Sequence, residues 1–410
     1  MIKFQLKDRD EKTRVRTGVF KSNQNSFTTP NRALTSTEVN YEYGLKNYAP
    51  RGIDYPNDFF LAQIKIDAES LWTRDSDYFA SVVKQCKRYT SIITDKTCIF
   101  KPVLYKQVRE KQEDGRFKRV NRIIQNLDLE LDTEKTNRII RSIIHAGYEA
   151  DFDAVTLPFL ERNFRLNVFL QNNKLGENYA LNDLNSGITI ISELPHSENI
   201  DDFQKAMRIY ADKNPEGILG IPHRSLSSYH FTHIAVKDFS EHDDSEKIGL
   251  LCLDAPRKHS IRDVSFPHYS MLQGYDGVAR QIPKASFLKE DGEDNNKKEI
   301  SQIRKFIASR LSVEALDKGV FFNETEINTS CDIFKKYTYK ELSRQAIRQE
   351  QLDVAFKVME TFDSYKEMKD CQVYVASNDF KDYLKKRQSL NQAFQYDFSR
   401  KQKGLGDFFK

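Results

Sequence analysis

The chain has 410 residues, which is long for one hydrophobic core, so we expect two or three domains. Hydrophobic residues make up 39% of it, enough for a sizeable core, and no stretch approaches the ~20 apolar residues that span a bilayer. The 64 lysines and arginines nearly balance the 60 acidic residues, so the formal net charge is only +4. That balance argues against a dedicated nucleic-acid-binding protein but leaves room for a local basic patch.

The N-terminus and the cysteines indicate the cellular compartment. The segment MIKFQLKDRDEKTRVR begins charged and has no apolar signal core, so the sequence predicts a cytoplasmic protein without a membrane segment. The cysteines are odd in number, widely spaced and free of CxxC pairs, which argues against a disulfide scaffold and a structural zinc site. We therefore expect no metal and no cofactor, and thiols that are mostly buried, at Cys86, Cys98, Cys252, Cys331 and Cys371.

Three regions are predicted along the chain. Residues 1–124 start with a polar arm, and we interpret them as a substrate-selecting or regulatory region. A catalytic domain is expected over 125–345, where predicted strands and helices are mixed. Helical periodicity with a flexible tail follows over 346–410. The expected fold class is α+β, that is, mixed α/β.

In the first half of the chain the pattern predicts a helix at Ala80–Tyr89 and a strand within Ser91–Tyr105. The basic stretch Lys106–Arg122 follows. Asp132 is a good N-cap, and isoleucines at helical spacing after it predict a helix that ends at Gly147. Farther along, the apolar runs predict strands at Leu166–Leu170, Ile188–Ile191 and Ile218–Ile221 and a helix at Ile200–Ala211.

The next segments determine where the candidate chemistry would lie. His233–Val236 and Ile248–Leu253 are separated by a polar turn, which predicts an antiparallel hairpin. A helix is expected from Ile300 to Leu311 and a strand at Val320–Ile327. The N-cap residues at 328–330 then predict the start of another helix.

Three chemically useful residues coincide with the ends of these predicted elements. His233 opens a strand, Asp254 ends the next one, and Cys331 lies where a strand turns into a helix. A thiol nucleophile needs a base and a group that orients that base. The first turn of a helix would also favour the thiolate. His230 is a rival base, and each residue taken singly has a structural interpretation as well.

The order His, Asp, Cys resembles a clan of thiol enzymes. This clan includes adenovirus protease, SUMO proteases, bacterial effector deubiquitinases and the YopJ-type acetyltransferases. The matching text is HIAVKD from His233, LLCLDAP around Asp254 and TSCDIF around Cys331. Ser330 and Asp332 stand where the family usually has an acidic residue and a glycine. The resemblance covers about a third of the chain.

The resemblance implies a ubiquitin-like-protease core and a cysteine peptidase. His233 would take the thiol proton, Asp254 would orient the ring, Cys331 would attack, and the amide of Asn328 would assist the oxyanion. The substrate would be a conjugate of ubiquitin or a ubiquitin-like protein, and the enzyme a bacterial effector acting in a host cell. The alternative within the clan is an acetyltransferase using acetyl-CoA, whose basic pocket Lys106–Arg122 would supply.

The C-terminal tail supports a non-enzymatic alternative. Its sequence fits the Q-x-x-L-x-x-F-F pattern of peptides that dock on sliding clamps of the eukaryotic and archaeal type. Leu405 with the two aromatics would form an apolar plug, and the amide of Gln402 would bond beside it. This interpretation predicts a clamp-binding protein that docks through Gln402, Leu405, Phe408 and Phe409.

Overall fold

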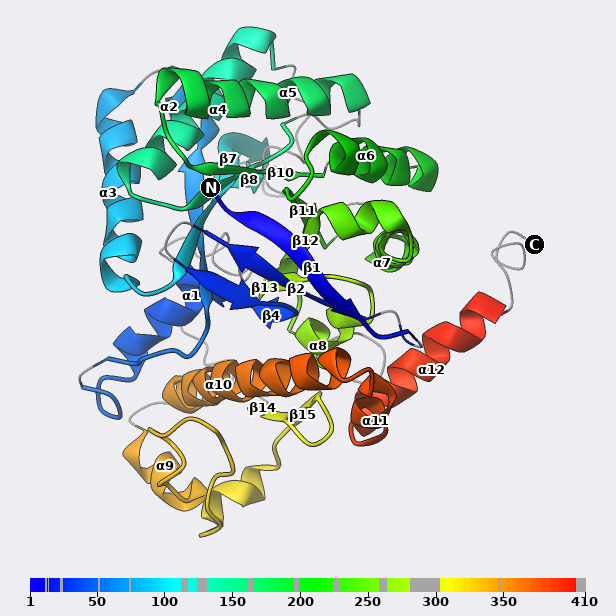
Figure 1. Cartoon of the computed structure of the whole chain (residues 1–410). Coiled ribbons are helices and arrows are strands. Elements are labelled where there is room, and N and C mark those ends of the chain that lie inside the picture. The colour runs from blue at the N-terminus through cyan, green and yellow to red at the C-terminus, as the bar shows by residue number, and fades with distance from the viewer. Residues whose placement is uncertain are drawn as a thin grey trace.

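The computed structural model describes most of the chain. It describes residues 1–410 except for 12, 14, 23–24, 51, 74, 112–116, 124–130, 161–164, 195–198, 224–228, 258–263, 281–302, 347–348 and 403–410. Within these residues the fold is mixed α/β and is built around one large parallel sheet (Figure 1). No helix in the described part of the chain is long and apolar enough to cross a membrane.

The parallel sheet closes on itself. Arg32 in β4 (Asn31–Arg32) pairs with Val278 of β13 (Gly277–Arg280), and β5 (Leu34–Thr35) pairs with β6 (Phe59–Asp67). Only Ala33 separates β4 from β5, and its N–H donates to the Val278 carbonyl at 2.9 Å. The two short strands therefore form one strand of the barrel wall, which joins both ends of the sheet. We call each strand of this wall a stave. The other staves are β7 (Thr97–Lys111), β9 (Ala154–Leu157), β10 (Thr189–Glu193), β11 (Ile218–Pro222) and β12 (Gly249–Ala255).

Helices alternate with the staves and cover the outside of the barrel. In the described residues this gives eight parallel staves in chain order, which is the (β/α)₈ barrel architecture. Ile139, Ile140, Ile143 and Ile144 are buried in α4, and Asp132 caps it, so this predicted helix is confirmed. The helices are α1 (Ser36–Val39), α2 (Ala68–Trp72), α3 (Ser76–Ile92), α4 (Thr133–Glu149), α5 (Leu166–Asn178), α6 (Ile200–Lys213), α7 (Tyr229–Ser240), α8 (Phe266–Met271) and α10 (Gln349–Ala376).

A small antiparallel sheet closes the N-terminal end of the barrel. It consists of β1 (Lys3–Arg9), β2 (Arg16–Lys21) and β3 (Ser26–Thr28), and its rings of Phe4, Phe20 and Phe27 join the apolar residues of the barrel interior. A Cβ on Gly249 would lie 2.5 Å from Phe20 Cε1, so this position needs glycine for the ring to enter. A void of about 10 Å³ remains among these side chains, so the interior at the N-terminal end of the barrel is closely packed.

Several sequence-based strand and helix predictions are wrong. Leu166–Leu170 and His233–Val236 lie in helices α5 and α7, not in strands. The predicted antiparallel hairpin is absent because β12 pairs in parallel with β11 and β13. The predicted helix at 300–311 contains strand β14 (Arg304–Ile307), which pairs with β15 (Ser312–Ala315).

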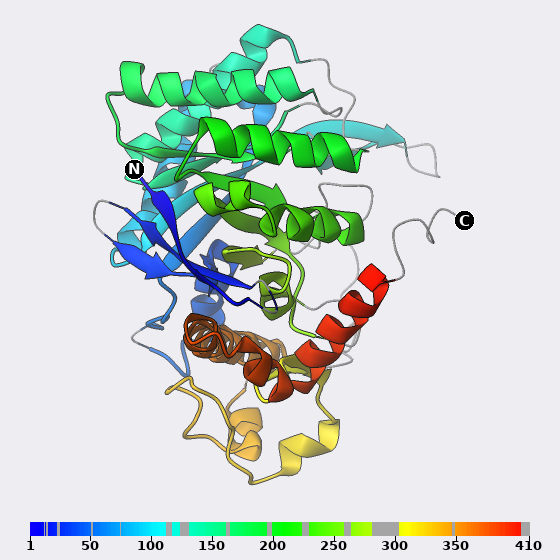
Figure 2. The same cartoon turned by 45° about the vertical axis from the view of Figure 1, so that its right-hand side comes forward.

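The C-terminal part of the chain is helical, as predicted. Helix α10 packs along the barrel, and α11 (Phe380–Lys385) and α12 (Gln388–Gln402) follow it (Figure 2). The predicted region boundary at residue 124 does not coincide with a break in the sheet, because β7 pairs with β9. The barrel therefore draws strands from both sides of that boundary, and the ubiquitin-like-protease core stays a prediction.

Candidate active site

Polar side chains replace the apolar interior at the C-terminal end of the barrel. Side chains two residues apart on a strand share a face. Ile99, Ala154 and Ile191 belong to the interior cluster, so the residues two positions later also face the inside of the barrel, one layer higher. These residues are Lys101 on β7, Thr156 on β9 and Glu193 on β10, which are neighbouring strands. In (β/α)₈ barrels this rim carries the chemistry.

Lys101 is the centre of this layer. Its Nζ lies 3.0 Å from Glu193 Oε1 and 3.6 Å from Asp254 Oδ2. Thr156 donates its hydroxyl to the same Glu193 oxygen at 2.6 Å. Strand β12, which carries Asp254, lies across the barrel from β7, so the contact with Lys101 crosses the interior. We call Lys101, Glu193 and Asp254 the rim trio.

A β-bulge brings Asp254 into the trio. The pairing of β12 with β13 shifts by one residue between Cys252 and Ala255. Leu253 faces the interior and Ala255 packs in the outer core, so the extra residue reverses the alternation at Asp254. Its φ of 59° lies in the left-handed region, which aspartate tolerates better than most residues. Bulges of this kind re-aim side chains at barrel rims.

The electrostatics of the trio favour a charged lysine. Burial by itself would lower the pKa of Lys101, but the negative charges of Asp254 and Glu193 outweigh it and raise this pKa. A lysine that serves as a nucleophile needs the opposite shift. Lys101 therefore acts as a fixed cation that positions two carboxylates.

Gln63 adds an amide to the same layer. It pairs directly with Lys101 in the register of β6 with β7 and is 6% exposed. Its Nε2 donates to the carbonyl of Arg280 at 2.8 Å. Its Oε1 has no hydrogen-bond partner among the residues that the structure describes. A buried acceptor without a partner is a candidate contact for a ligand or water.

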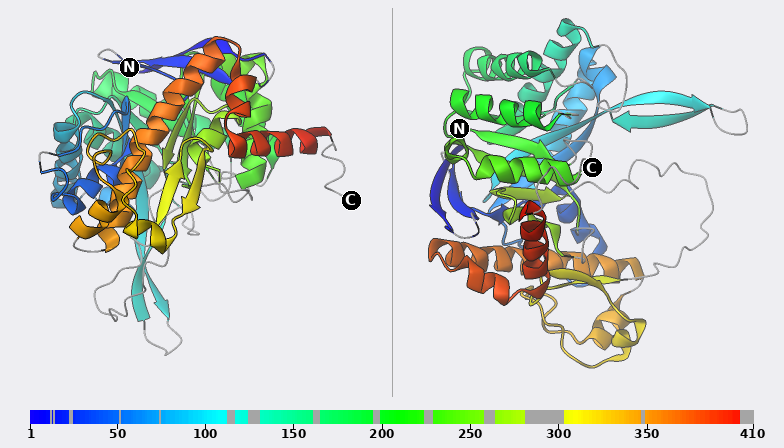
Figure 3. Two further views of the ribbon diagram at one scale, coloured as in Figure 1. Left: turned by 90° about the horizontal axis from the view of Figure 1, so that it is seen from below. Right: turned by 90° about the vertical axis from the view of Figure 1, so that its right-hand side faces the viewer.

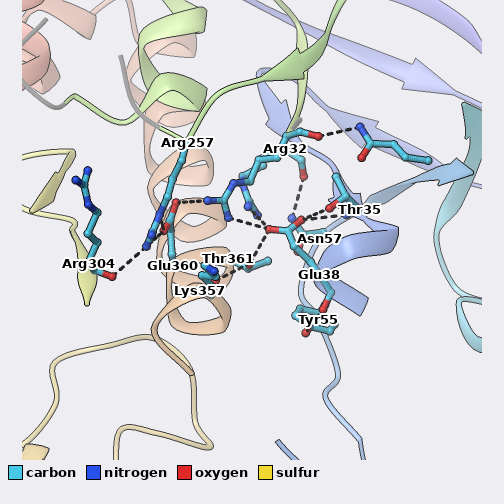
Figure 4. Close-up of polar contacts among 12 residues, drawn as sticks. Arg32, Thr35, Glu38, Tyr55, Asn57, Arg257, Arg304, Lys357, Glu360 and Thr361 are labelled. Carbon is cyan, nitrogen blue, oxygen red and sulfur yellow. Dashed lines mark hydrogen bonds and ion pairs between the residues drawn. The ribbon is translucent and has the colours of Figure 1, made fainter. Parts of the chain in front are cut away.

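A buried network of ion pairs supports the rim from outside the barrel wall (Figure 4). Glu38 of α1 pairs with Arg32, lies 3.4 Å from Arg280 and accepts the hydroxyl of Thr361 at 2.9 Å. Glu360 of α10 is the second hub. It lies 3.2 Å from Arg280 Nη2 and accepts Arg257 Nε at 2.6 Å. The network thereby fastens α10 to the C-terminal ends of β12 and β13.

The two glutamates of this network have lowered pKa values. Burial would raise the pKa of Glu38 and of Glu360, but nearby guanidinium groups more than offset it. For Glu38 these are Arg32 and Arg280, and for Glu360 they are Arg280 and Arg257. Both carboxylates are therefore ionised at neutral pH, although they are almost completely buried.

The structure places the residues of the predicted thiol triad in three different segments of the fold. Asp254 lies at the barrel rim, whereas His233 and His230 lie in helix α7 on the barrel's outside. The structure does not describe the side chains of these two histidines. Cys331 precedes α9 (Tyr339–Gln345) in the chain, and its neighbour Ser330 bonds to Asp363 of α10.

The surroundings of Cys331 differ from the expected helix start. Val320–Ile327 is not a strand, since its first residues belong to a 3₁₀ turn at Lys318–Phe322. Thr329 and Ser330 do not cap a helix, because both donate their hydroxyls to Asp363 of α10, at 3.1 and 2.6 Å. Asn328, the predicted oxyanion donor, is exposed. Cys331 itself is completely buried, and burial raises its pKa to about 12.

Two further sequence predictions concern clamp binding by the C-terminal tail and the absence of a metal site. Gln402 ends helix α12, and Leu405, Phe408 and Phe409 lie outside the described residues, so clamp binding stays a prediction. No cluster of three or more His, Cys, Asp or Glu residues suited to a metal ion is found in the described ranges.

Sequence reasoning missed Lys101, Thr156, Glu193 and Gln63. The sequence marks two of these residues as unusual. Lys101 interrupts the apolar run CIFKPVLY, and Glu193 ends the run ITIISE. A charged residue inside a strand that is otherwise buried indicates a paired or functional position.

The thiol hypothesis can be tested by reactivity. Because the described thiols are buried and the pKa of Cys331 is near 12, the native chain should react slowly with Ellman's reagent near pH 8. Denaturation should expose all the thiols. Fast labelling of the native chain that Cys331→Ala abolishes would contradict this and revive the thiol mechanism.

The ion-pair network predicts a pH-dependent stability difference. Glu360→Gln leaves Arg257 and Arg280 partly unpaired and should lower the free energy of unfolding by about 3 kcal/mol at neutral pH. Because folding lowers the pKa of Glu360 from 4.5, its stabilisation is complete above that pH and is lost as the pH falls through the folded value.

The measurement is urea unfolding of both proteins from pH 7 down to pH 3, and the difference should shrink below about pH 4.5. Glu314→Gln, which removes an exposed pair with Arg310, is the control and should change stability by less than about 1 kcal/mol. A difference for Glu360→Gln that stays constant over this range would contradict the assignment.

Comparison with known proteins gives no family for this chain. No protein-family model matches the sequence, and no curated protein matches it.

Proposed function

We propose that the chain is an enzyme that cleaves or transfers a glycosidic bond at the barrel rim, with Asp254 as the carboxylate that faces the reacting carbon. The observation that carries this proposal is that Lys101, held by Glu193, contacts Asp254 across the barrel interior and so orients its partly exposed carboxylate. A carboxylate that faces the anomeric carbon is the group that retaining glycosidases use as nucleophile.

Asp254 is the carboxylate with access to a substrate. Its side chain is 32% exposed, whereas that of Glu193 is 3% exposed and bonded to both Thr156 and Lys101. The left-handed backbone at Asp254 also marks a position where a strained conformation is maintained, which is frequent at functional sites. Glu193 is therefore a positioning residue that fixes the ammonium of Lys101.

The charge of the trio suits a cationic transition state. Two carboxylates and one ammonium leave one excess negative charge, and the low polarity of the barrel interior strengthens its effect. Glycosidic bond cleavage develops positive charge on the sugar ring. The carboxylate of Asp254 stabilises that charge, and Gln63 Oε1 can accept a hydrogen bond from a substrate hydroxyl or N–H.

The reaction has two balanced steps. An oxygen of Asp254 forms a bond to the anomeric carbon while the leaving group departs with the electron pair of the broken bond. Water or an acceptor nucleophile then attacks the same carbon and releases the carboxylate, and the proton that the nucleophile loses passes through solvent to the departed leaving group. Water gives hydrolysis and another acceptor gives transfer. Lys101 keeps the carboxylate oriented through both steps.

The test is a substrate panel with matched variants. The panel contains 4-nitrophenyl glycosides, free nucleosides and oligonucleotides, and product release is followed by absorbance and mass spectrometry. The wild type should turn over at least one class, and Asp254→Asn should reduce the rate by ~1,000-fold or more. Asp95→Asn, an exposed carboxylate beside the opposite end of β7, should leave it unchanged.

A covalent trap gives a second readout. A fluorinated substrate analogue of the class that is turned over should add its sugar mass to a peptide that contains Asp254. Absence of turnover across the panel, or full activity of Asp254→Asn, would contradict the proposal. The thiol peptidase and the acetyltransferase stay predictions from the sequence, and this substrate panel does not test them.

A further inference from the structure

Strand β7 is much longer than its place in the barrel requires. It pairs with β6 as far as Tyr105, opposite Asp67, and beyond that point only with β8 (Phe117–Ile123). We call this two-stranded ribbon, Lys106–Lys111 with Phe117–Ile123, the arm. Figures 2 and 3 show it extending away from the body of the protein.

The arm leaves the barrel at the rim that carries the trio. All staves are parallel, so the C-terminal end of each stave, including β7, lies at the same rim. Figure 3 shows the arm and the N-terminal sheet at opposite ends of the barrel. Lys101 and Lys106 are five residues apart on one strand, a distance of roughly 17 Å. A ligand held by the arm would therefore reach over the trio.

The arm carries the chain's positive charge. The sequence from residue 106 to residue 123 contains seven lysines and arginines and three acidic residues, a difference of +4. The whole chain also has a formal charge of +4, so the rest of it is neutral in sum. The near balance of acidic and basic residues over the whole chain therefore does not hold for this segment, which is strongly basic.

The register of the ribbon sets like charges opposite each other. Lys106 pairs with Arg122 and Arg109 with Arg119, whereas Glu110 with Lys118 is the one compensated pair in the described register. Directly opposed like charges destabilise a ribbon, and a lone two-stranded hairpin is marginal already. A polyanion bound along the arm would neutralise this repulsion.

The base of the arm adds an aromatic surface. The Nζ of Lys106 lies 5.3 Å from the centre of the Trp72 ring and 3.4 Å from Glu69. Trp72 is partly exposed, and so is Tyr105 on the same strand as Lys106. Aromatic rings beside cations are the combination that binds single-stranded nucleic acid, through base stacking and phosphate contacts.

We propose that the arm binds the phosphate backbone of a nucleic acid and places one of its nucleotides at the rim trio. This proposal rests on the proposed function for its second half, where the bond that reacts would be the N-glycosidic bond of that nucleotide. A two-stranded ribbon also fits the major groove of a duplex, so the arm can hold either a single strand or a duplex.

The test measures binding by fluorescence anisotropy with fluorescein-labelled DNA and RNA oligonucleotides, each as single strand and duplex. The arm variant combines Arg109→Gln, Arg119→Gln and Arg122→Gln. It should bind the preferred oligonucleotide at least ~10-fold more weakly, and the dependence of affinity on salt should become shallower by about 0.9 per lost phosphate contact.

Two further variants make the result specific. The charge-matched control combines Lys84→Gln, Lys213→Gln and Lys381→Gln, three exposed lysines on α3, α6 and α11, and should bind like the wild type. Replacing Gln107–Asn121 with an Asn-Gly turn should weaken binding as much as the arm variant does. Thermal unfolding of all variants checks that the barrel is intact.

The outcomes separate this proposal from the proposed function. Wild-type binding that the arm variants do not weaken, or no binding to any oligonucleotide, would overturn the arm's role. Arm-dependent binding to an acidic protein or to anionic vesicles without binding to oligonucleotides would overturn the partner class. If the arm binds oligonucleotides but no glycosidic bond is cleaved, the proposed function fails and the arm's role stands.

Discussion

A buried ammonium group, that of Lys101, determines the architecture of the barrel rim. Removing an ammonium from water costs several kcal/mol, and the cost is offset only if opposite charges meet it in good geometry. Glu193 provides one such charge from a near strand. Asp254 provides the other from across the barrel, and it does so because a bulge inserts an extra residue into β12. The irregular end of β12 is thus what allows Asp254 to reach the ammonium.

The two ends of the barrel have different roles. At the N-terminal end, aromatic rings of the small sheet fill the interior, and the buried pair of Arg16 with Asp276 ties that sheet to the staves. At the C-terminal end, apolar packing gives way to charged and amide groups. The Glu38 and Glu360 network then holds α10 against β13 from outside. Apolar packing of the interior and the polar candidate site therefore lie at opposite ends, as in (β/α)₈ barrels generally.

Local signals in the sequence predicted local structure well. Helices α4 and α6 follow from apolar residues at helical spacing and from capping residues at their starts. The strands were harder to interpret, because parallel strands buried on both faces are short apolar runs that resemble helix segments such as Leu166–Leu170. The order of the staves depends on pairings between distant segments, and no local pattern contains them. The predicted hairpin and the region boundaries were inferred without that information.

The same limit applies to the site. Asp254 was selected because it ends a strand, and it does lie at a strand end, but its partner is Lys101 rather than a histidine. That pairing spans the barrel and could not be inferred from either neighbourhood. Cys331 follows hydroxyl residues that predict a helix start, whereas the structure bonds those hydroxyls to Asp363. The charged residues in the apolar runs of β7 and β10, Lys101 and Glu193, are the local signals that indicate the rim.

Strand β7 connects the two proposals, since it carries Lys101 at the rim and then continues into the arm. Both depend on the ion pairs that the Lys101 ammonium makes with two carboxylates. The most direct measurement is the pKa of Lys101 by NMR of lysine side chains labelled with ¹³C or ¹⁵N, assigned with Lys101→Arg. With both carboxylates beside the ammonium, this pKa should lie above the ordinary 10.5 and should decrease in Asp254→Asn. A value below 10.5 in the wild type would show that burial dominates and that the carboxylates do not meet the ammonium.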